Sequence, residues 1–257
     1  MTALSCAALV VSCDRYRDLW RPFFALFWRY WPDCPFPVYL GSNFETYSDE
    51  RVTSLTAGED ESWSKNLRFF LNRLDSEYVL LLLEDFFLNR TVSTATLIDH
   101  LNALDQLGGS VLRLRPNPPP DIPVRGYPTI GSIYRFAPFR VSAQASIWKR
   151  LDLLALLRDG ESAWEFERQA TIRSQSRANG FFCTYAAKLP YRHVVEQGKW
   201  FWSAAPLYKK ENIGCDFNAR LVMGPFAAFS KVIHGHARLL KLRMLVRIQR
   251  AYRRPGR

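Results

Sequence analysis

The sequence predicts an α/β protein, with a mostly parallel sheet flanked by helices. The first observation is the order of its patterns. Apolar runs alternate with helical periodicity through the first 90 residues, an order typical of parallel sheets. The second is the run at 79–83, where five aliphatic residues follow one another, as in a strand that helices cover on both faces. The third is composition, because 48% hydrophobic residues in a chain of 257 provide for a large core.

The first half of the chain contains five predicted elements. Pro32 ends the aromatic helix, because the residue before a proline disfavours the helical conformation. The helix before the aliphatic run has apolar residues at helical spacing. In order, the elements are strand 4–12, helix 19–31, strand 36–43, helix 62–74 and strand 79–83.

The second half continues the alternation. A helix at 94–107 ends at two glycines, and a strand follows at 111–116. The Pro-rich segment 116–128 is predicted to be a long, ordered loop. Residues 140–157 pass from a strand into a helix, and a further helix begins near Ser162. Without repeats or a low-complexity linker, the simplest division is one domain, residues 1–224, with a C-terminal appendage, residues 225–257.

Several classes of protein are disfavoured. Five widely spaced cysteines without a C-x-x-C pair argue against a disulfide framework or a zinc site, and favour a reducing compartment. The P-loop, the G-x-G-x-x-G fingerprint and the G-x-S-x-G elbow are all missing. The four histidines are scattered and carry little signal. The N-terminus lacks a basic region before its apolar run, and no apolar stretch is long enough to span a bilayer. We therefore expect a cytoplasmic protein.

Glu84 and Asp85 follow the aliphatic run directly, at the carboxyl end of the predicted strand. Ligands of open α/β sheets collect at this edge. Two carboxylates there can hold a hard divalent cation, with a diphosphate completing the oxygen ligands. The alternative is structural, with one carboxylate capping the next turn or pairing with an arginine. A shared ion requires the chain to turn, because neighbouring side chains of a strand point to opposite faces.

Two further segments carry candidate residues. In ESAWEFERQ, Ser162 and Glu165 fit a capping box, while Glu165 or Glu167 at a helix start could act as a general base. In SWSKNLR, Lys65 and Asn66 lie near a helix N-terminus, which suits phosphate oxygens. The alternative for the second segment is a solvated basic face.

The C-terminal segment holds most of the net charge of +11. Residues 231–257 contain nine basic and no acidic residues. On a helical projection, one narrow arc, opposite Met244 and Ile248, holds Arg243, Arg247, Arg250 and Arg254. A basic amphipathic helix on an anionic membrane surface explains this pattern. Nucleic-acid binding through phosphates, and a disordered tail or partner-binding helix, are the alternatives.

Taken together, VVSCDRYRD, WSKN, LLLLED and WEFE resemble the motifs of GT-A-fold glycosyltransferases, similar to family 2 type enzymes and their uncharacterised bacterial relatives. The resemblance covers roughly residues 5–200. It implies a GT-A-like (Rossmann-like) sheet whose strand-end acidic motif, here Glu84 and Asp85, binds a divalent metal and the sugar nucleotide. Phe86 stands where the usual D-x-D motif has its second aspartate, and Arg168 follows the last Glu of WEFE where an aspartate is usual.

The resemblance also assigns the remaining site residues. The loop after the first strand would contact the nucleotide through Ser12, Asp14 and Arg15. Lys65 and Asn66 match the basic residue and asparagine that precede the acidic strand. Glu165 or Glu167 would be the base.

The expected function is an inverting glycosyltransferase that uses a nucleoside-diphosphate sugar and Mg²⁺ or Mn²⁺. Its acceptor would be a hydroxyl of a glycan or a lipid-linked molecule at the inner face of the cell membrane, where the C-terminal helix would hold the enzyme. Trp148, Trp164 and Trp200 are candidates for a platform under a sugar ring, with packing in the core as the alternative. The competing functions are a nucleic-acid-binding or DNA-glycosylating protein, and a noncatalytic GT-A-like scaffold.

Overall fold

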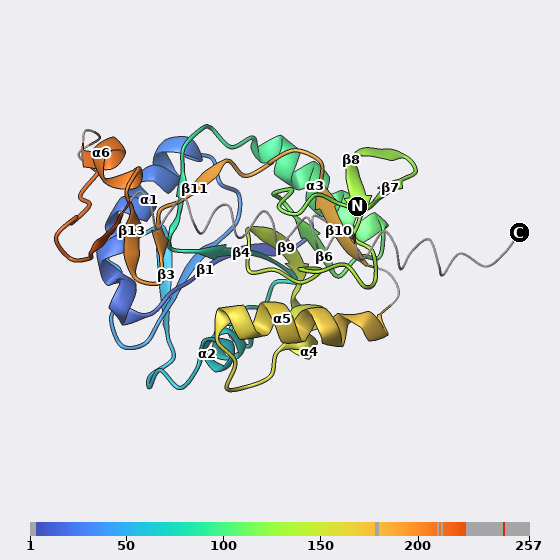
Figure 1. The fold of residues 1–257 in the computed structure, drawn as a ribbon, viewed down its shortest axis with the longest axis horizontal. Coiled ribbons are helices and arrows are strands. Elements are labelled where there is room, and N and C mark those ends of the chain that lie inside the picture. The colour runs from blue at the N-terminus through green and yellow to red at the C-terminus, as the bar shows by residue number, and fades with distance from the viewer. Residues whose placement is uncertain (1–3, 178–179, 210, 212, 225–243, 245–257) are drawn as a thin grey trace, which may run out of the picture.

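A computed structural model describes residues 4–177, 180–209, 211, 213–224 and 244 (Figure 1). Its centre is a nine-stranded sheet of order β3-β2-β1-β4-β9-β6-β10-β8-β7. In sequence order these strands are β1 Cys6–Val11, β2 Val38–Ser42, β3 Val52–Thr56, β4 Tyr78–Leu83, β6 Val111–Arg113, β7 Ile122–Val124, β8 Tyr127–Ser132, β9 Ser146–Lys149 and β10 Phe181–Thr184. Only β8 and β9 run against the others. The predicted α/β class is confirmed.

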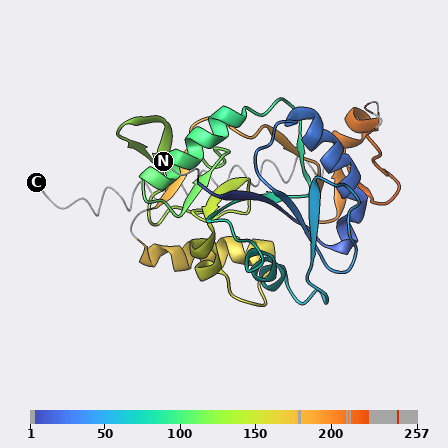
Figure 2. The ribbon, with the colours of Figure 1, turned by 180° about the vertical axis from the view of Figure 1, so that it is seen from behind.

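Helices cover both faces of the sheet (Figures 1 and 2). On one face lie α2 Trp63–Leu71, α4 Arg150–Leu156 and α5 Ala163–Arg173, and on the other lie α1 Trp20–Tyr30 and α3 Thr94–Gln106. Alternate residues of β4 enter the two layers, with Leu80 and Leu82 in one core cluster and Val79 and Leu81 in the other. The aliphatic run is therefore buried on both faces, as predicted.

The remaining elements are short and lie around the sheet. β5 Phe86–Leu88 pairs with β11 Tyr191–His193, and a third sheet joins β12 Val195–Glu196, β13 Lys199–Phe201 and β14 Val222–Met223. The short helices are η1 Asp14–Leu19, η2 Ser174–Ser176 and α6 Ala204–Lys209. In Figure 1, α6 and β13 lie together at the left end of the molecule, beside α1.

Several strands of the structure were not predicted from the sequence, among them β10 of the central sheet and the short strands β5 and β11–β14. The predicted loop 116–128 contains β7 and the first residues of β8, which form a hairpin through Gly126 at φ +83°. Pro123 is tolerated in β7 because this strand is at the edge of the sheet, where a missing N–H breaks no ladder. At the opposite edge, β3 was not predicted, because it is short and most of its side chains are partly or fully exposed.

The C-terminal predictions are not addressed by the fold. Apart from Met244, residues 225–257 lie outside the described part of the chain, and with them the predicted basic amphipathic helix. Among the described helices, none is both long enough and apolar enough to cross a membrane.

Candidate active site

The carboxyl ends of β1 and β4 bring two polar segments to one edge of the sheet. These strands are parallel, and Val11 pairs with Leu83, so Ser12 and Glu84 follow at the same level. Glu84 and Asp85 form a turn between β4 and β5, which frees them from the up-and-down alternation of a strand. Only 8% of Glu84 and 9% of Asp85 is exposed. The chain thus buries two adjacent carboxylates where ligands of α/β sheets collect.

Asp85 has one occupied and one free carboxylate oxygen. Its Oδ2 lies 2.7 Å from Nε2 of His193, while its Oδ1 is buried and accepts no hydrogen bond from the residues that the structure describes. The pairing of β5 with β11 places His193 opposite Phe86, and the N–H of Val194 donates to the Asp85 carbonyl at 3.0 Å. Burial works against protonation of His193, but the charge and hydrogen bond of Asp85 outweigh it and raise its pKa above 6.5. A buried acceptor without a partner is costly, so Asp85 is suited to a ligand.

Glu84 is held in an unfavourable charge environment. Burial first, and then the charge of Asp85, raise the pKa of Glu84 well above 4.5, although Arg220 acts in the opposite direction. Asp18 adds a further negative charge that raises this pKa. The carboxylate pair is therefore a place that positive charge would stabilise.

Glu84→Gln is expected to stabilise the protein at pH 8. Because the folded-state pKa of Glu84 is raised above 4.5, its protonated form contributes stability at low pH, and this contribution is lost as the pH rises through the raised pKa. We expect a gain in unfolding free energy of about 1–3 kcal/mol at pH 8, the usual cost of an uncompensated buried group. Urea unfolding at pH 8 and near pH 4.5, where the gain should vanish, measures it.

Glu77→Gln is the matched control for that measurement. Glu77 precedes the same strand, but its side chain is 47% exposed and it pairs with Lys149 at 3.2 Å. Its replacement should change stability little at either pH. A loss of stability in Glu84→Gln at pH 8 would show that the native state holds Glu84 charged and well compensated.

The three predicted nucleotide-contacting residues of the first loop occupy different environments. Asp14 accepts backbone hydrogen bonds from residues 43–45, with the Asn43 N–H at 3.0 Å. It thereby ties the loop after β1 to the loop after β2. Ser12 accepts a hydrogen bond from Nε1 of Trp20 at 2.7 Å, and the Arg15 side chain is exposed. Ser12 and Asp14 therefore hold the loop at the carboxyl edge of the sheet through hydrogen bonds, whereas the Arg15 side chain is exposed to solvent.

Lys65 and Asn66 belong to the first turn of α2, which Ser62 caps. Lys65 is exposed and pairs with Glu61, while Asn66 is buried and donates from Nδ2 to the Asp60 carboxylate at 2.8 Å. The structure therefore places both beside acidic residues of the loop after β3.

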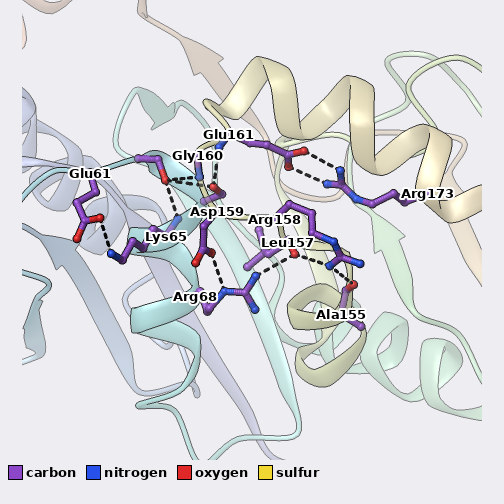
Figure 3. Close-up of polar contacts among 12 residues, drawn as sticks. Glu61, Lys65, Arg68, Ala155, Leu157, Arg158, Asp159, Gly160, Glu161 and Arg173 are labelled. Carbon is purple, nitrogen blue, oxygen red and sulfur yellow. Dashed lines mark hydrogen bonds and ion pairs between the residues drawn. The ribbon is translucent and has the colours of Figure 1, made fainter.

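A network of polar contacts joins α2 to the segment before α5 (Figure 3). Arg68 donates to Asp159 at 2.9 Å and to the carbonyl of Leu157 at 2.9 Å. Arg173 makes a two-bond ion pair with Glu161 at 2.6 and 2.7 Å. These contacts fix where the helix that carries Glu165 and Glu167 begins.

The two candidate bases on α5 differ sharply. Glu165 is exposed and completes the capping box with Ser162, which lowers its pKa. Burial raises the pKa of Glu167, against the opposing effect of hydrogen bonds from the Ala143 N–H at 2.8 Å and the Ser142 hydroxyl at 2.9 Å. Both bonds end on Oε1, and Oε2 accepts none from the described residues. Glu167 therefore keeps an oxygen that can receive a proton.

The loop held by Glu167 lies at the same edge as Glu84. β4 and β9 are antiparallel, with Leu81 opposite Ser146, so the residues just before Ser146 extend past the carboxyl end of β4. Gln144 of this loop donates from Nε2 to the Asn117 carbonyl at 2.8 Å, and its buried Oε1 finds no partner within the described ranges of the chain. Gln144 was not predicted from the sequence, because an isolated glutamine in an apolar stretch carries no pattern.

The carboxylate pair fits a divalent metal ion, though not as a complete protein cage. Asp85 offers its unpartnered Oδ1, and the raised pKa of Glu84 marks a site short of positive charge. Within the described residues there is no group of three or more histidine, cysteine or acidic side chains placed to hold a metal. Glu84 and Asp85 would hold such an ion only together with ligand or water oxygens.

The tryptophans separate into core and surface. Trp148 and Trp200 are fully buried, whereas Trp164, in the first turn of α5, is 55% exposed. Packing in the core accounts for the first two. Only Trp164 of the three retains a surface on which a sugar ring could stack.

A cavity of about 840 Å³ opens at the other end of the sheet. Its lining includes Leu4, Pro37 and Asp75, which lie at or before the starts of the central strands. Cys6, which also lines it, has a pKa raised to about 12 by burial and is unreactive at neutral pH. The chemically suited groups are at the carboxyl edge, and we place the site there despite the size of this cavity.

No family model and no curated protein sequence matches this chain. Solved structures similar to it include S. aureus TarS 1–349, with 14% sequence identity and a TM-score of 0.49 over 73% of this chain and 59% of that fragment. The same fragment in complex with UDP gives 15% identity and a TM-score of 0.48 over the same shares, 73% and 59%. This chain therefore spans less than two thirds of the TarS fragment, and its function is inferred below from its own residues.

Proposed function

We propose that this protein is a GT-A-like inverting glycosyltransferase that takes its sugar from a nucleoside-diphosphate donor. One observation carries the proposal: β4 ends in two buried carboxylates, and the Oδ1 atom of Asp85 has no partner in the described part of the chain. The parallel order β3-β2-β1-β4, with polar loops after β1 and β2 joined by Asp14, supports a nucleotide at this edge.

In this proposal Glu84 and Asp85 hold Mg²⁺ or Mn²⁺ together with the donor diphosphate. The ion would supply positive charge to the departing diphosphate. Ser12, Asp14 and Arg15 border the nucleotide on the β1 side, and Lys65 and Asn66 on the α2 side. Gln144 Oε1 would accept a hydrogen bond from a hydroxyl of the sugar. This buried oxygen, which has no partner among the described residues, would thereby gain one.

Glu167 is the proposed base. Its free Oε2 would take the proton of the acceptor hydroxyl, whose oxygen then bonds to the anomeric carbon as the bond to the diphosphate oxygen breaks. The diphosphate leaves with the electron pair, and attack from the opposite face inverts the anomeric configuration. The raised pKa of Glu167 supports this role, because a base works best near the operating pH. Trp164 would support the acceptor.

The acceptor class follows from the C-terminal segment and is likewise a proposal. A basic amphipathic helix in 225–257 would hold the enzyme on the inner face of the cell membrane, near glycan or lipid-linked acceptors. This placement makes the protein cytoplasmic and peripheral to the membrane. Duplex DNA is the competing partner for the same basic residues. Measuring how the protein distributes between anionic vesicles and duplex DNA, across a series of salt concentrations, separates the two partners.

Thermal unfolding with a panel of nucleotides tests the proposed function. UDP, GDP, CDP and dTDP, with their sugars, are each added with Mn²⁺, Mg²⁺ or EDTA; UDP is the nucleotide of one similar TarS structure. We expect the nucleoside diphosphates of one nucleobase to raise the Tm of the protein when metal is present. A ligand that binds only the native state adds about 2.7 kcal/mol to the unfolding free energy at 100 times its Kd. The matching nucleosides are the control. No shift with any diphosphate would refute a donor site and favour a scaffold.

A further inference from the structure

Arg220 joins the segment before β14 to the loop after β1, across 202 residues of sequence from its ion-pair partner Asp18. Its Nε and Nη2 donate to the two carboxylate oxygens of Asp18 at 2.7 and 2.6 Å, and Nη2 also donates to the Arg15 carbonyl at 2.8 Å. The guanidinium lies 4.1 Å over the Tyr16 ring. Only 7% of the side chain is exposed. Arg220 is therefore held in one orientation on η1.

The guanidinium lies at the same edge of the sheet as the carboxylate pair, because η1 follows β1 and Val11 at the end of β1 pairs with Leu83 at the end of β4. Its charge lowers the pKa of Glu84, and the charges of Glu84 and Arg220 act in opposite directions on the pKa of Tyr16, a residue of η1. Burial lowers the pKa of Arg220, but Asp18 outweighs this effect, so the group stays charged at all working pH values. A permanent positive charge thus lies on η1, the segment that follows the carboxyl end of β1.

The fork of Arg220 is only partly used. Its hydrogen bonds to described residues come from Nε and Nη2, and none comes from Nη1. In the two-bond geometry with Asp18, the N–H groups of Nη1 point away from that carboxylate. Planar forks of this kind suit phosphate oxygens.

We infer that Arg220 is a binding group for the donor diphosphate, with Nη1 donating to a phosphate oxygen beside Glu84 and Asp85. This inference rests on the proposed function. It adds a fixed positive charge to the leaving-group side of the site, supplied by the C-terminal part of the chain. Asp18 and Tyr16 are then positioning residues, because they orient the guanidinium without touching the ligand.

The test compares nucleoside diphosphates with monophosphates. Affinities of UDP, GDP, CDP and dTDP, and of UMP, GMP, CMP and dTMP, are measured by calorimetry on the full chain, with Mn²⁺ and with EDTA. For the nucleotide whose nucleobase the protein accepts, Arg220→Gln is expected to lower the affinity for the diphosphate about 10- to 100-fold, the usual effect of losing a charge-assisted hydrogen bond. The affinity for the monophosphate should fall much less. Arg177→Gln is the matched control, since Arg177 pairs with Asp152 at 2.6 Å and belongs to no proposed role.

Asp18→Asn separates binding from a purely structural role. It breaks the same ion pair but keeps the guanidinium and one acceptor oxygen for it, so its loss of preference for diphosphate should be partial and clearly smaller than that of Arg220→Gln. Equal loss of that preference in Asp18→Asn and Arg220→Gln, or no loss in Arg220→Gln, would overturn the inference while the donor site stood. If Arg220→Gln does not fold, Arg220→Lys replaces it, with an expected loss of about threefold to tenfold because one ammonium cannot reproduce the fork. A wild-type protein that binds no diphosphate removes the proposed function, and this inference with it.

Discussion

Asp85→Ala is expected to abolish the thermal stabilisation that a nucleoside diphosphate gives with metal. The substitution removes Oδ1, the buried acceptor without a partner among the described residues, from the turn that ends β4. At 100 times the wild-type Kd, the lost stabilisation corresponds to about 2.7 kcal/mol. The measurement is the Tm of wild type and variant with the nucleotide that binds, in Mn²⁺ and in EDTA.

Asp75→Ala provides the control, because Asp75 is an exposed carboxylate before the start of the same strand. It should keep the full nucleotide-induced shift. Asp85→Asn adds a second comparison, since the amide keeps the size of the side chain and can still contact His193 but lacks the negative charge. Loss of the shift in both Asp85 variants assigns the effect to charge. A full shift in Asp85→Ala would mean that Asp85 serves only as the partner of His193.

The central part of this site could be predicted because its pattern is local. Five aliphatic residues followed by Glu84 and Asp85 specify a buried strand with carboxylates at its end, whatever the rest of the chain does. The capping box of Ser162 and Glu165 is likewise written within four residues, and the structure confirms it. Side chains whose environment depends on near neighbours were accessible to sequence reasoning.

His193 and Arg220 could not be found in this way. His193 reaches Asp85 across 108 residues, and Arg220 reaches Asp18 across 202. Neither sits in a motif, and their positions depend on the pairing of β5 with β11 and on the path of the chain before β14. Long-range pairings of this kind are set by tertiary packing, which local patterns do not encode.

The choice between the two glutamates of α5 shows the same division. The WEFE pattern does not distinguish the two glutamates. In the helix, Glu165 faces solvent and Glu167 faces residues 142–143. Which glutamate is half-buried depends on the loop before β9, whose position follows from the antiparallel insertion of β9 between β4 and β6. The sequence contains both candidates, and only the fold distinguishes them.

Glu167→Gln is expected to lower the rate of sugar transfer by about 10²- to 10⁴-fold, the usual contribution of a general base. The amide can keep its oxygen toward the Ala143 N–H and the Ser142 hydroxyl, so the loop before β9 should stay in place. Donor binding, measured by the nucleotide-induced Tm shift, should therefore be unchanged. Release of nucleoside diphosphate from the matching sugar nucleotide measures the rate, with the membrane fraction supplied as acceptor.

Because burial raises the pKa of Glu167 and the base acts when deprotonated, the wild-type rate should fall as the pH drops through that raised pKa. Glu165→Gln, which alters only an exposed helix cap, should keep its rate within a few-fold of wild type. The reverse result, with Glu165→Gln inactive and Glu167→Gln active, would move the base to the exposed position and leave Glu167 as the residue that holds the loop.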